Sequence, residues 1–276
     1  MRIAVVGGTG LIGTKVSARL IAGGHDVVVA SRETGVDSYT GEGLEEALAG
    51  VETLIDVSNS GYIDLAAALD FFYASTLNLL NYGAAAGVRH HVALSVVGTD
   101  RLARTEGGYF AAKAQQEKLI REFRHPFTIV HATQFFEFVP MIADAGTDHD
   151  VVRLSRALIQ PMAADDVAAA VETVALGEPR NRMIEFAGPE QFRLDELVNR
   201  DLRARSDMRA VVIDPLATYF GTGLEERELL PADDAIVSTT RYEDWLHAGG
   251  EHVDPMTGEY RSFYPVSPEP QRARRA

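Results

Sequence analysis

Three side chains of this sequence, Ser95, Tyr109 and Lys113, have the types and spacing that could move a proton. Tyr109 and Lys113 stand four residues apart in a segment with helical periodicity, so both project from one face of the expected helix. A neighbouring ammonium stabilises phenolate and lowers the pKa of the phenol toward neutrality, where it can transfer protons. Ser95 ends an earlier apolar run and could donate a hydrogen bond to the same substrate oxygen. The alternative is a surface helix on which this common spacing has no function.

The first residues predict the site in which such a tyrosine would act. An apolar run over residues 2–6 leads into glycines at positions 7, 10 and 13, and a helical pattern follows to about residue 22. In a dinucleotide-binding turn, such glycines allow the tight turn, the close approach of the pyrophosphate and the packing of helix on strand. The diphosphate would lie at the N-terminus of the helix. The alternative is a glycine-rich turn that binds nothing. The predicted contacts are Gly7, Gly8, Thr9, Gly10, Leu11, Ile12 and Gly13.

The end of the second expected strand, residues 25–30, indicates which dinucleotide is preferred. An acidic residue at this position would bind the ribose diol of NAD, whereas an arginine accommodates the 2′-phosphate of NADP. The strand is followed by Ser31 and Arg32, so we predict NADP(H) rather than NAD(H). The alternative is that Arg32 is a solvated surface arginine, and Glu33 beside it weakens the local positive field.

Further contacts are expected where the other strands end, because ligands of doubly wound sheets lie beyond the carboxyl ends of the strands. The third expected strand covers residues 53–57, the fourth 90–95 and the fifth 125–130, and a long helix is expected over 64–86. The cofactor-binding residues predicted in this way are Val57, Ser58, Asn59, Ser95, Ala132 and Thr133, joined by Lys113.

The order of the elements predicts an α/β protein with a Rossmann-type, doubly wound parallel sheet and a small C-terminal α+β substrate lobe. We assign residues 1–180 to the nucleotide-binding domain, 181–248 to the discontinuous lobe and 249–276 to a tail without hydrophobic periodicity. The apolar run 135–141 and the aromatic residues Tyr219, Phe220 and Trp245 could wall a substrate pocket or equally fill the core.

The composition excludes several other classes of function. Against 26 lysines and arginines stand 40 aspartates and glutamates, and the net charge of −14 argues against nucleic acid or an anionic membrane as partner. Without cysteine, disulfides and thiolate chemistry are excluded. No apolar run approaches the ~18 residues of a spanning helix, and we expect a cytoplasmic protein. No metal site is predicted, because His90 and His91 would point to opposite faces of a strand and Asp165-Asp166 are interpreted as helix N-caps.

Together these motifs resemble the atypical, NmrA-like branch of the short-chain dehydrogenase/reductase superfamily. The likeness spans about residues 1–190, more weakly to near residue 245, and also includes the segments 128–135 and 160–168. It implies a Rossmann core that holds NADP at the strand ends, with Tyr109 as proton donor and Lys113 bound to the nicotinamide ribose. The superfamily also makes a homodimer plausible, paired through the 64–86 helix and the helix that carries Tyr109.

The predicted function is an NADPH-dependent reductase of a small carbonyl, quinone or related electrophile. One alternative is a non-catalytic, NADP(H)-sensing regulator, because the resembling branch contains proteins that bind the dinucleotide without turnover. A second alternative is an epimerase or dehydratase of a nucleotide sugar with bound NAD. Arg32 and the small C-terminal lobe speak against the second alternative.

Overall fold

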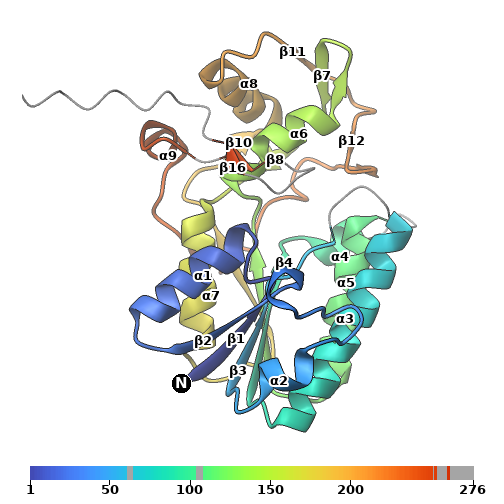
Figure 1. Ribbon diagram of the computed structural model, residues 1–276. Coiled ribbons are helices and arrows are strands. Elements are labelled where there is room, and N and C mark those ends of the chain that lie inside the picture. The colour runs from blue at the N-terminus through green and yellow to red at the C-terminus, as the bar shows by residue number, and fades with distance from the viewer. Residues whose placement is uncertain (61–64, 104–107, 251, 254–259, 262–276) are drawn as a thin grey trace, which may run out of the picture.

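The computed structural model describes residues 1–60, 65–103, 108–250, 252–253 and 260–261 (Figure 1). The expected helix start at Asp64, the flanking Gly61 and Gly107, and most of the predicted tail 249–276 lie outside the described residues. Of that tail, two short strands are described, and they pair antiparallel: β15 (His252–Val253) and β16 (Tyr260–Arg261). Within the described residues, no helix combines the length and apolarity that crossing a membrane requires.

A seven-stranded sheet forms the centre of the molecule, and all of its strand pairs are parallel. Its strands alternate with helices along the chain and are rich in valine, isoleucine and alanine, as strands buried on both faces must be. The order across the sheet is β14 (Ile236–Val237), β9 (Met183–Ala187), β5 (Phe127–Ala132), β4 (His90–Val96), β3 (Thr53–Asp56), β1 (Arg2–Val6) and β2 (Asp26–Ala30).

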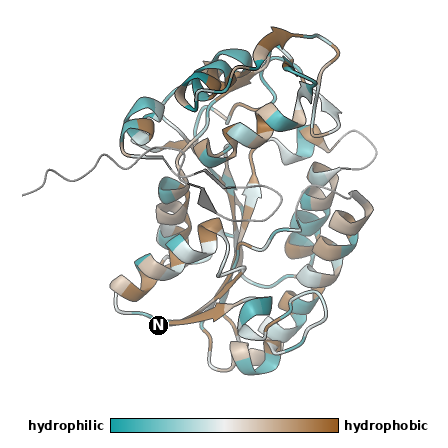
Figure 2. Cartoon of the chain, turned by 45° about the horizontal axis from the view of Figure 1, so that its top comes forward, coloured by the Kyte–Doolittle hydropathy of each residue, from teal (hydrophilic) through white to brown (hydrophobic). Residues whose placement is uncertain are grey.

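Helices cover both faces of this sheet, which confirms the predicted Rossmann-type α/β fold (Figure 1). The direction of the strand order reverses between β1 and β3, and this switch point is where such sheets bind ligands. Figure 2 shows the central strands as predominantly hydrophobic. On one face lie α1 (Leu11–Ala22) and α7 (Ala164–Ala175), and on the other α2 (Leu44–Leu48), α3 (Leu65–Ala86) and α5 (Tyr109–Glu122).

The predicted N-cap role of Asp165 and Asp166 is wrong. Helix α7 begins at Ala164, so both aspartates lie inside its first turn, where their charge still suits the helix dipole. The buried carboxylate of Glu137 caps the helix instead, and both of its oxygens accept from the Ala164 N–H at 3.1 Å. Asp165 binds Lys15 of α1, and Asp166 accepts hydrogen bonds from Thr240.

A smaller layer lies over the carboxyl edge of the sheet and draws on both sides of the boundary predicted near residue 180. Residues 136–159 join it, whereas β9 belongs to the central sheet. Its elements are η2 (Phe136–Phe138), α6 (Val139–Ala145), β6 (Thr147–Asp148), β7 (Val151–Leu154), β8 (Leu158–Ile159), β10 (Phe192–Arg193), α8 (Leu194–Ala204), β11 (Ala210–Ile213), β12 (Thr218–Tyr219), β13 (Thr222–Gly223) and α9 (Tyr242–His247). Its core contains Trp245, which packs against Phe136 and Tyr242.

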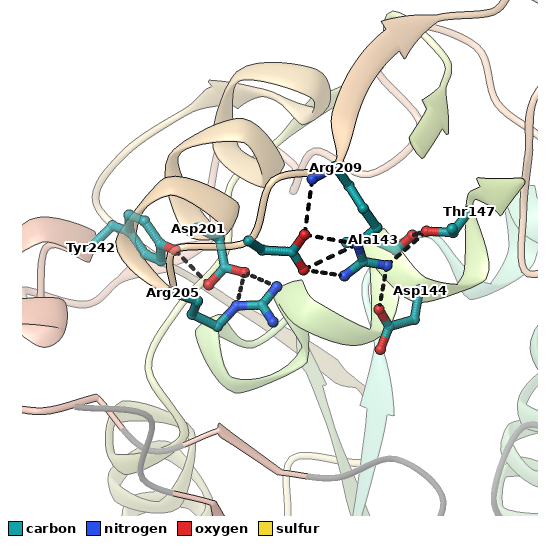
Figure 3. Close-up of polar contacts among 8 residues, drawn as sticks. Ala143, Asp144, Thr147, Asp201, Arg205, Arg209 and Tyr242 are labelled. Atoms are coloured by element: carbon teal, nitrogen blue, oxygen red, sulfur yellow. Dashed lines mark hydrogen bonds and ion pairs between the residues drawn. The ribbon is translucent and has the colours of Figure 1, made fainter. Parts of the chain in front are cut away.

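Two sets of charged contacts hold this lobe together (Figure 3). The carboxylate of Asp201 on α8 is fully buried and accepts hydrogen bonds from Arg205 Nε at 2.8 Å and the Tyr242 hydroxyl at 3.2 Å. Burial raises the pKa of Asp201, and the nearby Arg205 guanidinium opposes that rise. Arg209 binds Asp144 of α6 at 2.7 Å, so the segment after α8 is tied to α6.

We expect Asp201→Ala to destabilise the protein by about 3 kcal/mol, because it leaves the buried Arg205 guanidinium without its carboxylate. The free energy of unfolding in urea measures this change. Asp214→Ala is the matched control, since the carboxylate of Asp214 makes a 3.8 Å ion pair with the half-exposed Arg153 and accepts one exposed hydrogen bond from the Leu216 N–H, so its loss should cost about 1 kcal/mol or less. Equal losses in the two variants would contradict the role given to Asp201.

Candidate functional site

A cavity of about 580 Å³ lies at the carboxyl edge of the sheet, between the nucleotide-binding layer and the lobe. Fourteen of the sixteen residues predicted to bind the cofactor line it, together with Tyr109. The two predicted residues that do not line it are Gly8 and Gly13. The predicted lining residues are Gly7, Thr9, Gly10, Leu11, Ile12, Ser31, Arg32, Val57, Ser58, Asn59, Ser95, Lys113, Ala132 and Thr133.

The glycine turn after β1 leaves no room for side chains. A Cβ at Gly13 would lie 2.1 Å from the carbonyl oxygen of Gly7, and a Cβ at Gly8 would lie 2.7 Å from that of Val5. Gly13 therefore lets α1 pack against the turn, and Gly8 lets the turn lie close to β1 and β2, so neither glycine lines the cavity. Gly7 has a φ of +78°, and its Cβ would lie 2.8 Å from the backbone of Ser58. The turn after β1 and the loop after β3 thus meet backbone to backbone.

The N-terminus of α1 faces the cavity through Leu11 and Ile12. Its N-cap is Gly10, which offers no side-chain oxygen to the first N–H groups of the helix. Those groups have no partner within the helix, and the helix dipole makes this end attractive to an anion. The turn therefore has the shape and the polarity to bind a diphosphate.

Ser31 and Arg32 lie at the far end of the cavity from the lobe, where β2 ends. They begin the short helix η1 (Arg32–Thr34), which is fixed by the Ser31 N–H donating to Thr34 Oγ1 at 2.9 Å. Arg32 is exposed, and among the described residues its guanidinium has no carboxylate partner. This arrangement leaves its charge available to a ligand.

Lys113 lines the cavity, but its side chain is buried and its ammonium already binds other groups of the protein. Its ammonium donates to the Leu94 carbonyl at 2.7 Å and to the side-chain oxygen of Gln116, and it lies 4.6 Å above the ring of Phe72. Burial lowers the pKa of Lys113 to about 8, against the attraction of Asp56 and Glu117. An ammonium has three N–H donors, so one remains for a ligand.

The hydroxyl of Ser95 donates to Glu117 Oε1 at 2.5 Å, and the same oxygen lies 2.9 Å from His131 Nε2. Burial is the largest single influence on both pKa values and disfavours charge on both partners, but the hydrogen bonds and neighbouring charges together outweigh it. The pKa of Glu117 is lowered, and that of His131 rises to about 9 with further help from Glu185. The single proton of Ser95 is therefore directed at Glu117. The predicted role as donor to a substrate oxygen requires this proton to turn toward the cavity.

The lobe side of the cavity is aromatic, and most of its residues were not among the predicted site residues. Of the expected apolar run, Phe135, Phe138 and Met141 line the cavity, whereas Phe136 and Val139 lie in the core. Tyr219 and Phe220 also line it, and Trp245 does not. Ile142 of α6 lines the cavity as well, and the nucleotide-binding layer adds the aromatic residues Phe71 of α3 and Phe110 of α5.

Two buried polar side chains follow the end of β5 and lack hydrogen-bond partners in the described protein. Gln134 is 8% exposed and Thr133 is 1% exposed, and neither the amide of Gln134 nor the hydroxyl of Thr133 has a hydrogen-bond partner in the described protein. Buried polar groups without partners are costly, so such groups in a cavity wall indicate a ligand. The sequence predicts that the strand end 131–134 faces the nicotinamide half of the site, although Gln134 itself is not among the sixteen predicted contacts.

The described part of the chain thus combines a Rossmann-type fold with an elongated cavity at the switch point of the sheet. No protein-family model and no curated protein sequence matches the chain. Among solved structures, it is similar to MoeE5 in complex with UDP-glucose and NAD, at 16% identity and a TM-score of 0.66 over 90% of this chain and 92% of that one.

Two further solved structures are also similar. The NADPH complex of the quinone oxidoreductase QOR2 from Escherichia coli is 22% identical, with a TM-score of 0.57 over 78% of each chain. The UDP-glucose 4-epimerase of Thermus thermophilus in complex with NAD is 18% identical, with a TM-score of 0.62 over 86% of this chain and 90% of that one. The resemblance inferred from the motifs is therefore confirmed at the level of the fold.

The His131–Glu117 pair should make stability depend on pH. Because the pKa of His131 rises from 6.5 to about 9 on folding, its charge stabilises the protein fully below about pH 6.5 and ceases to do so above about pH 9. The expected loss between these limits is about 2 to 3 kcal/mol. Urea unfolding at pH 6 to 9 gives the free energy of unfolding of wild type and of His131→Gln. The difference between the two proteins measures the contribution of His131, because the opposing contribution of the buried Lys113 is the same in both and cancels.

His149→Gln is the control, because the side chain of His149 is 95% exposed. It should follow the wild-type pH profile. A constant difference between wild type and His131→Gln from pH 6 to 9 would show that His131 is not charged in the folded protein.

Proposed function

We propose that this protein is an NADPH-dependent reductase of a small, uncharged electrophile such as a carbonyl compound or a quinone. The observation that carries the proposal is one continuous cavity, which joins the glycine turn and Arg32 at one end to aromatic walls at the other. Ser95, Tyr109 and Lys113 line the same cavity. A dinucleotide lying along the cavity would present its reactive ring beside these three side chains.

The residues present fit an NADP molecule along its whole length. The N-terminus of α1 suits the diphosphate, and the guanidinium of Arg32, which has no carboxylate partner in the described chain, suits a 2′-phosphate. At the other end, the Gln134 side chain offers one donor group and one acceptor, the complement of the nicotinamide carboxamide. The third N–H of the Lys113 ammonium suits a ribose hydroxyl.

When bound, a reduced nicotinamide supplies the hydride that the reduction needs. The part of the protein is to hold the substrate and to move one proton. Tyr109 donates its phenolic proton to the substrate oxygen as negative charge develops there, and solvent returns a proton to the phenolate. The positive charge of Lys113 favours that phenolate. Ser95 donates to the substrate oxygen once its proton turns from Glu117 toward the cavity.

The charge of the cavity favours this function over that of a nucleotide-sugar epimerase. A nucleotide sugar carries a diphosphate of its own, which a protein binds with arginine or lysine. Among the described residues that line the cavity, the cations are Arg32 and Lys113, and the cofactor uses both. The described residues of the lobe side supply none. Among the described lining residues, no further cation is therefore left for a second diphosphate.

A second candidate is a protein that binds NADP(H) and signals without turnover. Two observations favour it: the Ser95 proton is directed at Glu117, and two of the three Lys113 donors are held by Leu94 and Gln116. In this case the three side chains serve the fold, and Tyr109 transfers no proton.

NADPH oxidation against a panel of quinones, aldehydes and enones separates the two candidates. For a reductase of carbonyl compounds, we expect Tyr109→Phe to lower kcat about 100-fold or more with little change in the Kd for NADPH, because one general acid contributes roughly 10²- to 10⁴-fold. Tyr39→Phe is the matched control, since its hydroxyl donates to Asp70 and neither residue lines the cavity. Tight NADPH binding without turnover of any panel compound would favour the sensor.

Arg32→Ala should weaken NADPH binding about tenfold and leave NADH binding within about twofold, because only NADPH carries the 2′-phosphate that the guanidinium would bind. Titration of the nicotinamide fluorescence measures both Kd values. Arg89→Ala is the control, because Arg89 pairs with Glu52 outside the cavity. A similar loss for NADPH and NADH would contradict the NADP preference.

A further inference from the structure

The hairpin formed by β12 and β13 carries an unusual residue at its tip. Tyr219 pairs with Thr222, which leaves Phe220 and Gly221 as a two-residue loop. Both have positive φ, +49° and +85°, as a type I′ turn requires. Asparagine or aspartate followed by glycine is favoured in such turns, and a bulky residue at positive φ is a genuine outlier. The phenylalanine therefore weakens the turn, and a benefit elsewhere must account for it.

The ring of Phe220 lines the cavity beside other aromatic rings. It meets Tyr219 edge to face at 4.7 Å, and Tyr219 stacks on Phe110 at 6.2 Å. Phe135 and Phe138 stack on each other at 5.3 Å and line the same cavity. The two sets of rings come from segments far apart in the sequence and together form the lobe side of the cavity.

This side of the cavity carries no charge among its described residues. The charged side chains that line the cavity are Arg32, Glu33, Asp37 and Lys113, and all of them belong to the nucleotide-binding layer. An ionic group bound against the aromatic rings would lose its hydration without a partner, which is costly. A flat, uncharged ring would gain stacking and edge contacts there.

We propose that Phe220 is a specificity-determining residue, and that with its aromatic neighbours it binds a planar, uncharged aromatic ring system of the substrate. The identity of this ring as a substrate rests on the proposed reductase function. The subsite itself rests on the lining residues and the strained turn. Tyr219 buries its ring in the core of the lobe, whereas the ring of Phe220 is only partly buried against that core and also lines the cavity.

The test is the binding of 2-naphthol, measured by titration calorimetry with saturating NADPH. Decahydro-2-naphthol, which has the same carbon skeleton without the flat rings, is the matched ligand. We expect both Phe220→Asn and Phe220→Leu to weaken 2-naphthol binding about tenfold, which corresponds to about 1.4 kcal/mol. Phe220→Leu, which keeps an apolar contact, should change decahydro-2-naphthol binding less than about twofold. Phe220→Tyr keeps the ring and should bind 2-naphthol like wild type.

The variants separate stacking from folding. Asparagine suits the turn, and leucine preserves the apolar contact, so thermal unfolding should show that both variants fold. Wild-type affinity for 2-naphthol in Phe220→Leu, equal losses for both ligands in that variant, or no binding of 2-naphthol by wild type would overturn the proposal. Binding that depends on the ring of Phe220 in a protein that oxidises no NADPH would support the subsite and refute the reductase.

Discussion

In the turn between β1 and α1, the backbone packs directly against neighbouring backbone. The other parts of the cavity are positioned by that contact. With hydrogen as the side chain at Gly7 and Gly13, α1 can approach its own turn and the loop after β3 can approach both. Ser58 is then held by Asp56, whose other oxygen accepts from Gln116 of α5 at 2.9 Å. The helix that carries Tyr109 is thus linked through hydrogen bonds to the switch point of the sheet.

Helix α5 is also the place where stability and chemistry depend on the same side chains. Lys113 donates a hydrogen bond to Gln116, Gln116 donates to Asp56 at the end of β3, and Glu117 accepts from Ser95. These groups are buried, where a polar group left unpaired would be costly. Such a network holds each donor in one orientation, which favours precise binding. It also commits protons that catalysis could otherwise use, so the same contacts are compatible with an enzyme and with a binding protein.

The sequence predicted the fold and the nucleotide half of the cavity because both depend on local signals. Glycine spacing, strand length and the residues that follow each strand indicate where parallel strands end, and those ends meet at one edge. For the aromatic half, the sequence left pocket wall and core as equal alternatives for the run 135–141 and for Phe220, because only the tertiary packing of the lobe decides which of these rings line the cavity. The hydrogen-bond partners of Ser95 and Lys113 were not predicted either, because Glu117 and Gln116 resemble ordinary helix residues in the sequence. The cap of α7 comes from the distant Glu137 rather than from the adjacent aspartates.

Segments of the lobe alternate along the chain with the last two strands of the central sheet, and this order has a consequence for synthesis on the ribosome. The five strands from β1 to β5 are complete once residue 132 has emerged, so the glycine turn and α5 can assemble early. The sixth strand, β9, follows only after residues 136–159, and the edge strand β14 follows after the hairpin. Trp245 and Tyr242 then close the lobe from the last well-packed helix. A nascent chain therefore acquires its phosphate-binding end well before its aromatic end, and only the nearly finished protein encloses both.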